Sequence, residues 1–239
     1  MTTEPTLLAI DTATDACSVA VLACGAVAAH RSALMARGHA EALMPMVLEA
    51  LAAAGLGFAD LDAVGVTVGP GAFTGLRIGL SAARGIGLAA GIPVLGATTL
   101  EVVAHGVPED QRTGASIVAV IESKRADLYV QAFGPDLTPL SEPASLLPEA
   151  LADALPAGPL VLAGDGAGRA ADAITASNGA GRVSLSASGP HPDARILAAL
   201  IAARLADMSP GLDELAPPEP LYLRPPDAKR PAGGGRLRS

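Results

Sequence analysis

Residues 64–96 read VGVTVGPGAFTGLRIGLSAARGIGLAAGIPVLG. Valines alternate with small or polar residues over 64–68, which is typical of a β-strand, and Gly69-Pro70-Gly71 then turns the chain. The spacing predicts a helix over 76–90 that ends at Gly91, a natural left-handed cap. A short apolar run follows as a second strand. This order of strand, glycine-rich loop, helix and strand indicates an α/β fold.

Four small residues follow one another at intervals of four inside the expected helix: Gly75, Gly79, Ala83 and Gly87. They therefore lie on one face. A glycine in a helix costs about 1 kcal/mol relative to alanine, so the row needs a compensating gain. A face without side chains lets another backbone approach closely. The row packs either on this protein's own sheet or on a helix of a partner, and the sequence leaves both open.

Another helix is expected over 39–54, closed by Gly55, because apolar residues recur at helical spacing. Met44 falls off its apolar face, beside Pro45, which is tolerated in a first turn. An exposed methionine there would suit an adaptable interface, and a second core contact is the alternative. The apolar face comprises Leu43, Met46, Val47, Ala50, Leu51 and Ala54.

The loop 69–75 leads into a helix N-terminus, where free backbone N–H groups favour anions. Its glycine spacing differs from that of a Walker loop, and no lysine follows. Asp11 ends the first expected strand and could hold a hydrated cation or a nucleotide phosphate, or cap the turn through its side chain. The candidate set for a vestigial nucleotide site is Asp11, Thr12, Gly69 and Gly71.

Length and composition bound the class of protein. The 239 residues are 50% hydrophobic, enough for one large core or two modest ones. No apolar run approaches the roughly 20 residues of a membrane span, and the start at Met1 lacks the positive charge of a signal peptide, so we expect a cytoplasmic protein. Cys17 and Cys24 are expected to be core thiols. A net charge of −8 and 2% aromatic residues argue against autonomous nucleic-acid binding.

Two hairpins begin alike. Strands are expected over 7–11 and 18–23, and again over 116–122 and 127–133. Ala9-Ile10-Asp11-Thr12 in the first hairpin matches Val120-Ile121-Glu122-Ser123 in the second. The match suggests a duplicated fold of two lobes. The other expected elements are a strand over 26–31, a short helix over 98–105, a strand over 160–164, a helix over 192–208, an extended segment over 217–224 and a basic tail from Pro225 with Lys229, Arg230, Arg236 and Arg238.

Three motifs resemble the TsaB family, the bacterial accessory subunits of the machinery that makes threonylcarbamoyladenosine in transfer RNA. They are Ile10-Asp11-Thr12 with the strand at Ser18, the run Gly69-Pro-Gly-Ala-Phe-Thr-Gly-Leu-Arg77-Ile-Gly79, and Pro220-Leu-Tyr-Leu-Arg224. The resemblance spans the chain, although 134–215 carries little signature. Two mild departures are Ala72, where the family often has serine, and Glu122-Ser123-Lys124, where it usually has Asp-Ala-Arg.

The resemblance implies an actin-like ATPase, Hsp70-type (RNase H-like) duplicated α/β fold with two lobes, the second reduced. On this basis we expect an actin-like lobe over 1–106 that carries partner-binding helices, a smaller lobe over 107–216, and an extended Pro/Gly-rich basic tail over 217–239.

The family also has a catalytic paralogue, TsaD, formerly misassigned as a glycoprotease, which carries a His-x-x-x-His metal pair. The matching positions here are Thr99 and Val103, which cannot replace two imidazoles. No nucleophile with an evident base occurs elsewhere. The resemblance therefore implies a scaffold that is not an enzyme by itself, in a complex that transfers threonylcarbamoyl to N6 of adenosine 37 in tRNAs reading codons that start with A.

The expected partner is TsaD, with which the chain forms a heterodimer. The small ATPase TsaE joins them in a larger complex. When TsaD is absent, we expect the chain to form a homodimer. Transfer RNA is contacted indirectly, and no membrane is involved. No cofactor is assigned to the chain itself, and ATP could bind at an interface of the complex. The alternative function is a residual nucleotide-binding protein or weak ATPase. The expected partner interface comprises Leu43, Met44, Met46, Val47, Gly75, Gly79, Ala83, Gly87, Arg77 and Arg84.

Overall fold

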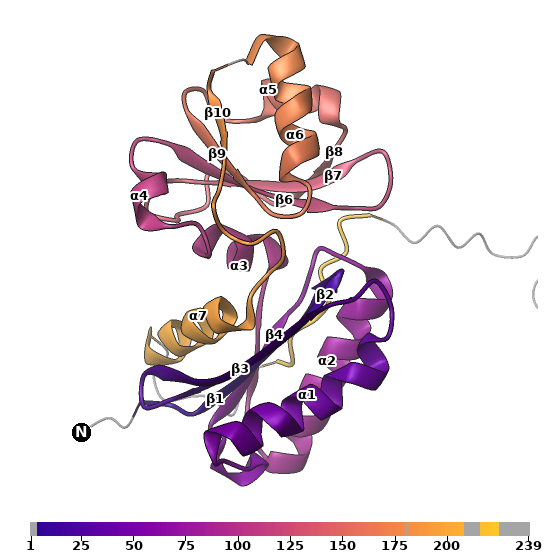
Figure 1. The fold of residues 1–239 in the computed structure, drawn as a ribbon, viewed down its shortest axis with the longest axis vertical. Helices are drawn as coiled ribbons and strands as arrows, with labels where there is room; N and C mark the ends of the chain where they lie inside the picture. Colours follow the sequence, from indigo (N-terminus) through magenta and orange to yellow (C-terminus); the bar gives the residue numbers. More distant parts are fainter. Residues whose placement is uncertain (1–3, 180, 208–215, 225–239) are drawn as a thin grey trace, which may run out of the picture.

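The computed structural model describes residues 4–179, 181–207 and 216–224, and it has two lobes stacked end to end (Figure 1). A five-stranded sheet forms the centre of the first lobe, in the order β3-β2-β1-β4-β5. The β1–β2 and β2–β3 pairs are antiparallel, and β4 and β5 join parallel to β1. Its strands are β1 Leu7–Thr14, β2 Ala16–Ala23, β3 Ala26–Leu34, β4 Ala63–Thr67 and β5 Val94–Ala97.

The second lobe repeats this plan. Its sheet has the order β10-β9-β6-β7-β8, so β6 takes the central position of β1, with antiparallel partners on one side and parallel ones on the other. The matching tetrapeptides therefore lie on equivalent strands, and the predicted duplication is confirmed. The strands are β6 Ser116–Glu122, β7 Leu128–Phe133, β8 Ala144–Leu146, β9 Leu160–Ala163 and β10 Val183–Leu185.

Helices cover both faces of each sheet. In the first lobe, α1 and α2 pack on one face and α7 on the other. In the second lobe, α6 with the short α5 packs on one face and α3 on the other. The helices are α1 His39–Ala54, α2 Phe73–Ala90, α3 Thr99–His105, α4 Glu109–Arg112, α5 Leu151–Ala154, α6 Ala167–Ile174 and α7 Ala194–Asp207, with single turns η1 Phe58–Asp60, η2 Pro148–Ala150 and η3 Thr175–Gly179.

The lobes exchange their last helices. The helix α3 follows the final strand of the first sheet but packs on β6 of the second, through Leu100 and Val103. The helix α7 follows the final strand of the second sheet but packs on β1 and β2 of the first, through Leu197 and Ile201. The expected lobe ranges 1–106 and 107–216 therefore need a correction, because by packing residues 99–105 belong to the second lobe and residues 194–207 to the first.

Most expected elements are present, with longer strands and some shifted ends. The helix α1 has the expected bounds, and Gly55 caps it at φ 69°. Pro45 lies beyond the first turn, contrary to the sequence interpretation. The helix α2 starts at Phe73 rather than 76, because the Ala72 N–H binds the Ala13 carbonyl and brings the chain into helical register early.

The sequence missed β8, β10 and α6, and the second lobe is reduced mainly in its helices. The expected basic tail from Pro225 lies outside the described residues.

The row of small residues in α2 faces the sheet of its own lobe. Gly75, Gly79, Ala83 and Gly87 are all buried. The Thr12 hydroxyl donates a hydrogen bond of 2.7 Å to the Gly75 carbonyl, and a Cβ at Gly79 would lie 2.5 Å from that hydroxyl oxygen. The first alternative for the row is therefore correct, and these four residues do not face a partner.

Gly75→Ala should destabilise the fold, because the new methyl group would collide with the Thr12 carbonyl of β1. We expect a loss of about 1–3 kcal/mol in the free energy of unfolding, despite the gain in helix propensity. Gly85→Ala is the matched control, since Gly85 is exposed on the same helix with no atom within 4 Å; it should stabilise by up to about 1 kcal/mol. Urea unfolding of both variants measures the difference, and equal effects would contradict the close packing.

Candidate functional site

An apolar groove lies between α1 and α2 on the outer side of the first lobe. It has a volume of about 490 Å³. Its floor is made of residues that also contribute to the core, whereas Met44 is 37% exposed and Phe73 50% exposed at its rim. Leu48, one turn after Met44, is 54% exposed. The groove is lined by Ala40, Leu43, Met44, Phe73, Thr74, Arg77, Ile78, Ser81 and Ala82.

Only some of the residues predicted to form the partner interface lie at the groove. Leu43, Met44 and Arg77 line the groove, so helical spacing brings three of the ten residues together at one surface. Val47 is buried, Met46 packs against the core, and the four small residues of α2 face the sheet. Arg84 lies on the same helix as the row and donates to the Pro218 carbonyl at 2.7 Å.

Phe73 is the groove residue that sequence reasoning missed. Its ring lies 5.3 Å from that of Tyr222, centroid to centroid. The Arg77 guanidinium stacks over Phe73 at 3.7 Å, and Arg77 Nε donates to the Tyr222 hydroxyl at 3.1 Å. The available signal was an aromatic residue in the glycine-rich stretch at the start of α2, in a chain that is only 2% aromatic. The contact adds residues of the C-terminal segment to the edge of the groove.

The candidate nucleotide residues are brought together, but they are enclosed. Asp11 is fully buried, and its Oδ1 accepts hydrogen bonds from the Thr67 hydroxyl at 2.6 Å and the Ala13 N–H at 3.3 Å. Its Oδ2 has no hydrogen-bond partner. Burial raises the pKa of Asp11 to about 7, despite the hydrogen bond from Thr67. Thr12 is likewise buried, with its hydroxyl bound to Gly75.

The glycine-rich loop is filled by the chain itself. A Cβ at Gly69 would lie 2.7 Å from the Leu221 carbonyl oxygen, and one at Gly71 would collide with the Ala13 carbonyl. The Ala72 N–H binds that same Ala13 carbonyl at 2.7 Å. Carbonyl oxygens therefore surround the loop where a phosphate would need N–H donors. This arrangement does not favour the vestigial nucleotide site.

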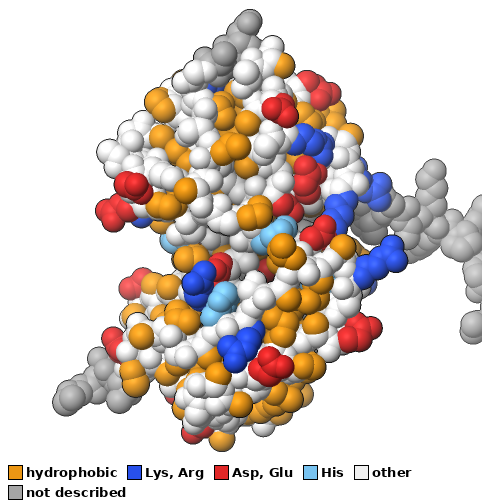
Figure 2. Space-filling model, in the orientation of Figure 1, with side chains coloured by type: hydrophobic (Ala, Val, Ile, Leu, Met, Phe, Trp, Pro, Cys, Tyr) orange, Lys and Arg blue, Asp and Glu red, His pale blue; other side chains and the backbone are white. Residues whose placement is uncertain are grey.

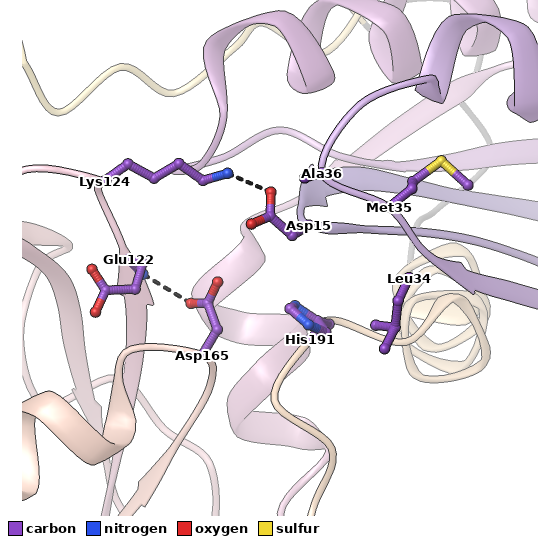
Figure 3. Close-up of a pocket in the computed structure, with 8 residues that line it drawn as sticks. All are labelled: Asp15, Leu34, Met35, Ala36, Glu122, Lys124, Asp165 and His191. Carbon is purple, nitrogen blue, oxygen red and sulfur yellow. Dashed lines mark hydrogen bonds and ion pairs between the residues drawn. The ribbon is translucent and has the colours of Figure 1, made fainter.

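A pocket of about 650 Å³ lies between the lobes. Figure 2 shows charged and histidine side chains at the waist of the molecule, and Figure 3 shows the pocket residues. Lys124 of the second lobe pairs with Asp15 of the first. Asp165 accepts the Glu122 N–H at 2.8 Å, and burial raises its pKa to about 6. The lining residues are Asp15, Leu34, Met35, Ala36, Glu122, Lys124, Asp165 and His191.

Ser18, His30 and Asp193 lie together but do not form a catalytic triad. The Ser18 hydroxyl and an Asp193 oxygen lie 3.2 and 3.4 Å from the same ring nitrogen, His30 Nε2. A triad needs the serine and the acid at different nitrogens. Ser18 is also buried and accepts the Ala194 N–H at 3.1 Å. Its role is to anchor the start of α7.

The two positions that match the paralogue's histidine pair lie in the core. Thr99 is fully buried, with a hydroxyl that has no partner, and Val103 packs against β6. An isopropyl group has no donor atom for a metal, so this pair does not fit one. In the described ranges 4–179, 181–207 and 216–224, no cluster of three His, Cys, Asp or Glu side chains could hold a metal ion.

The architecture defines the class: a duplicated, two-lobed α/β protein of the actin-like ATPase fold. The family model for TsaD, tRNA N6-adenosine threonylcarbamoyltransferase, matches residues 32–191. Escherichia coli TsaB, a tRNA threonylcarbamoyladenosine biosynthesis protein, is 40% identical over 124 residues, which cover 52% of each chain. The chain therefore belongs to the family that this model describes, and over about half of its length it is similar to TsaB.

Two further relatives match over most of the chain. An uncharacterized protein of Mycobacterium tuberculosis is 37% identical over 226 residues, 94% of each chain. The structure of YeaZ from Pseudomonas aeruginosa superposes with a TM-score of 0.75 at 29% identity, over 92% of this chain and 100% of that one. By contrast, the match spans only about half the length of the Escherichia coli and Haemophilus influenzae TsaB proteins. No helix in the described part is long and apolar enough to cross a membrane.

Asp11→Asn should change how stability depends on pH. The folded pKa of Asp11 is about 7, against 3.8 for a free side chain, so between these pH values the folded protein holds a proton that the unfolded chain has released. Stability therefore falls as pH rises from about 4 to about 7. We expect the variant to lose part of this fall and to be more stable than the wild type at pH 8 by about 1–3 kcal/mol.

Urea unfolding at pH 4, 6 and 8 measures this effect. Asp165, whose pKa is also raised by burial, is present in both proteins. Asp153→Asn, at an exposed position of α5, is the control and should leave the curve unchanged. An Asp11→Asn curve parallel to that of the wild type would contradict the raised pKa.

Proposed function

We propose that this chain is a non-catalytic scaffold of threonylcarbamoyladenosine biosynthesis that binds a TsaD-type catalytic subunit through the groove between α1 and α2. The observation that carries the proposal is the exposed apolar rim of that groove, Met44 and Phe73, with Leu48 beside it. Exposed apolar side chains clustered at a groove are a feature of protein–protein contact sites. Arg77, stacked on Phe73, adds the kind of cation that interfaces are enriched in.

The internal chemistry supports a role without catalysis of its own. Val103 has no atom that could bind a metal, so Thr99 and Val103 cannot replace a pair of imidazoles. Ser18 is buried at the start of α7. Asp11 is enclosed, and carbonyl groups fill the glycine-rich loop. Residual nucleotide binding or weak ATPase activity therefore finds no support at these residues, and ATP would bind, if anywhere, at an interface that the chain forms with its partners.

The wider assembly follows from the same proposal. A paralogue with the same duplicated fold presents similar faces, so the groove serves a heterodimer with the TsaD-type subunit and a homodimer in its absence. The TsaE-type ATPase and transfer RNA would then be reached through the catalytic subunit. With a net charge of −8, the scaffold has little electrostatic attraction for RNA. A cytoplasmic location is part of this proposal.

Met44→Asp should weaken binding to the TsaD-type subunit of the same organism by about tenfold or more, because a charge would be buried at the interface. Leu88→Asp is the matched control: Leu88 is 87% exposed on α2 and is not among the groove residues. Isothermal titration with the purified subunit measures both affinities. Equal affinities for the two variants would show that the groove is not the interface.

The function itself is tested by reconstitution. Threonylcarbamoyl transfer to transfer RNA is measured with all other components present, with and without this chain. We expect modification only when the chain is added, and much less with Met44→Asp than with Leu88→Asp. Full modification in the absence of the chain would refute the scaffold role.

A further inference from the structure

The segment 216–224 runs in an extended conformation from the first lobe to the second (Figure 1). The Leu221 N–H donates to the Val68 carbonyl at 2.7 Å, just beyond the end of β4. Two glycines make room for it, since a Cβ at Gly96 would lie 2.9 Å from Pro218 and one at Gly69 would lie 2.7 Å from the Leu221 carbonyl oxygen. The first lobe thus has a binding surface that is shaped to hold this segment.

One residue of the segment belongs to the edge of the groove. Tyr222 is 42% exposed, and it contacts Phe73 and Arg77, both of which line the groove. A partner that covers Phe73 would therefore also meet Tyr222. The segment is part of the surface that we assign to the catalytic subunit.

Two residues further on, the segment reaches the other lobe. Arg224 donates to Asp127 at 2.8 Å, and the Asp127 side chain is only 9% exposed. Asp127 also accepts hydrogen bonds from the hydroxyls of Ser123 and Ser145. Burial opposes ionisation of Asp127, but these hydrogen bonds and Arg224 hold its pKa below the usual value. The carboxylate is therefore charged and well held, which makes it a firm anchor for Arg224.

The anchor lies in the turn that forms one wall of the interlobe pocket. Residues 123–127 connect β6 to β7, and Lys124 of this turn pairs with Asp15 of the first lobe. Tyr222 and Arg224 are two residues apart, so their Cα atoms lie within about 7 Å. A shift of the chain at Tyr222 is therefore passed on to the backbone of Arg224, whose side chain binds Asp127 of the turn.

From these contacts we infer that residues 216–224 form a clasp that couples the docking groove to the closure of the two lobes. A partner that presses Tyr222 against Phe73 holds Arg224 on Asp127 and keeps Lys124 of the turn paired with Asp15. Release of Tyr222 loosens Arg224 and lets the turn at Lys124 move away from Asp15. The clasp itself is a property of the isolated chain, and only its control by a partner rests on the proposed function.

The first experiment measures the distance between the lobes in the isolated chain. Cys24 of the first lobe is exposed, so the prediction that it is a core thiol was wrong, and it can carry a spin label. A second label is placed on Glu149→Cys, an exposed position of the second lobe, and pulsed electron resonance gives the distance distribution between the two. Arg224→Ala should broaden the distribution toward longer distances, and Arg224→Lys should largely restore it. Arg195→Ala removes an exposed arginine that pairs with Asp193 two residues away, and it should leave the distribution unchanged.

The second experiment adds the TsaD-type subunit to the same labelled proteins. Binding should narrow the distance distribution of the wild type. The Arg224→Ala variant should still bind, but its distribution should narrow by no more than half as much. An unchanged distribution for Arg224→Ala in the isolated chain would overturn the clasp. Narrowing that persists in full in that variant would overturn the coupling, and a failure of the subunit to bind the wild type would count against the proposed function alone.

Discussion

The contact on which the first lobe depends is the approach of the α2 backbone to the backbone of β1. Thr12 donates its hydroxyl proton to the Gly75 carbonyl, and Gly79 lies over the same hydroxyl. Side chains normally hold a helix about 10 Å from a sheet or from another helix; here glycines remove that spacing. The helix consequently lies deep against the sheet, and the loop before it is drawn down so that Ala72 binds the Ala13 carbonyl.

This close packing determines which groups the glycine-rich loop contacts. In sequence, a loop of glycines before a helix predicts free N–H groups and an anion. In the structure, the loop is tied on one side to β1 and on the other to Leu221. The same glycines that suggested a phosphate site allow β1 and the segment at Leu221 to pack closely against the loop. Local pattern cannot separate these uses, because the second segment lies about 150 residues further along the sequence.

Periodicity predicted the elements that carry strong local signals. Apolar runs in two hairpins predicted β1, β2, β6 and β7, and alternation predicted β4. Glycine caps predicted the ends of α1 and α2, and a capping box between Thr98 and Glu101 marks the start of α3. The three-residue strands β8 and β10 were missed because such short runs have no measurable period. The exchange of α3 and α7 was also missed. A helix pattern states which face is apolar, but not which of two similar sheets will cover it.

That exchange limits how the lobes can move. The helices α3 and α7 contact each other between the sheets, where Arg204 of α7 binds Glu101 of α3 at 2.8 Å. Each lobe thus contributes a helix to the core of the other, and full separation would expose two apolar helix faces. Motion is therefore confined to a small hinge or shear about these helices.

For such a limited motion, contacts at the periphery of the interface have the greatest effect on the angle between the lobes. Lys124 with Asp15 and Arg224 with Asp127 both end on the turn between β6 and β7, away from the α3 and α7 contact. Both ion pairs join this turn to groups outside the second lobe, so a change in the angle between the lobes must strain or break them. A C-terminal segment fixed to the first lobe and ending on that turn is well placed to govern the angle between the lobes.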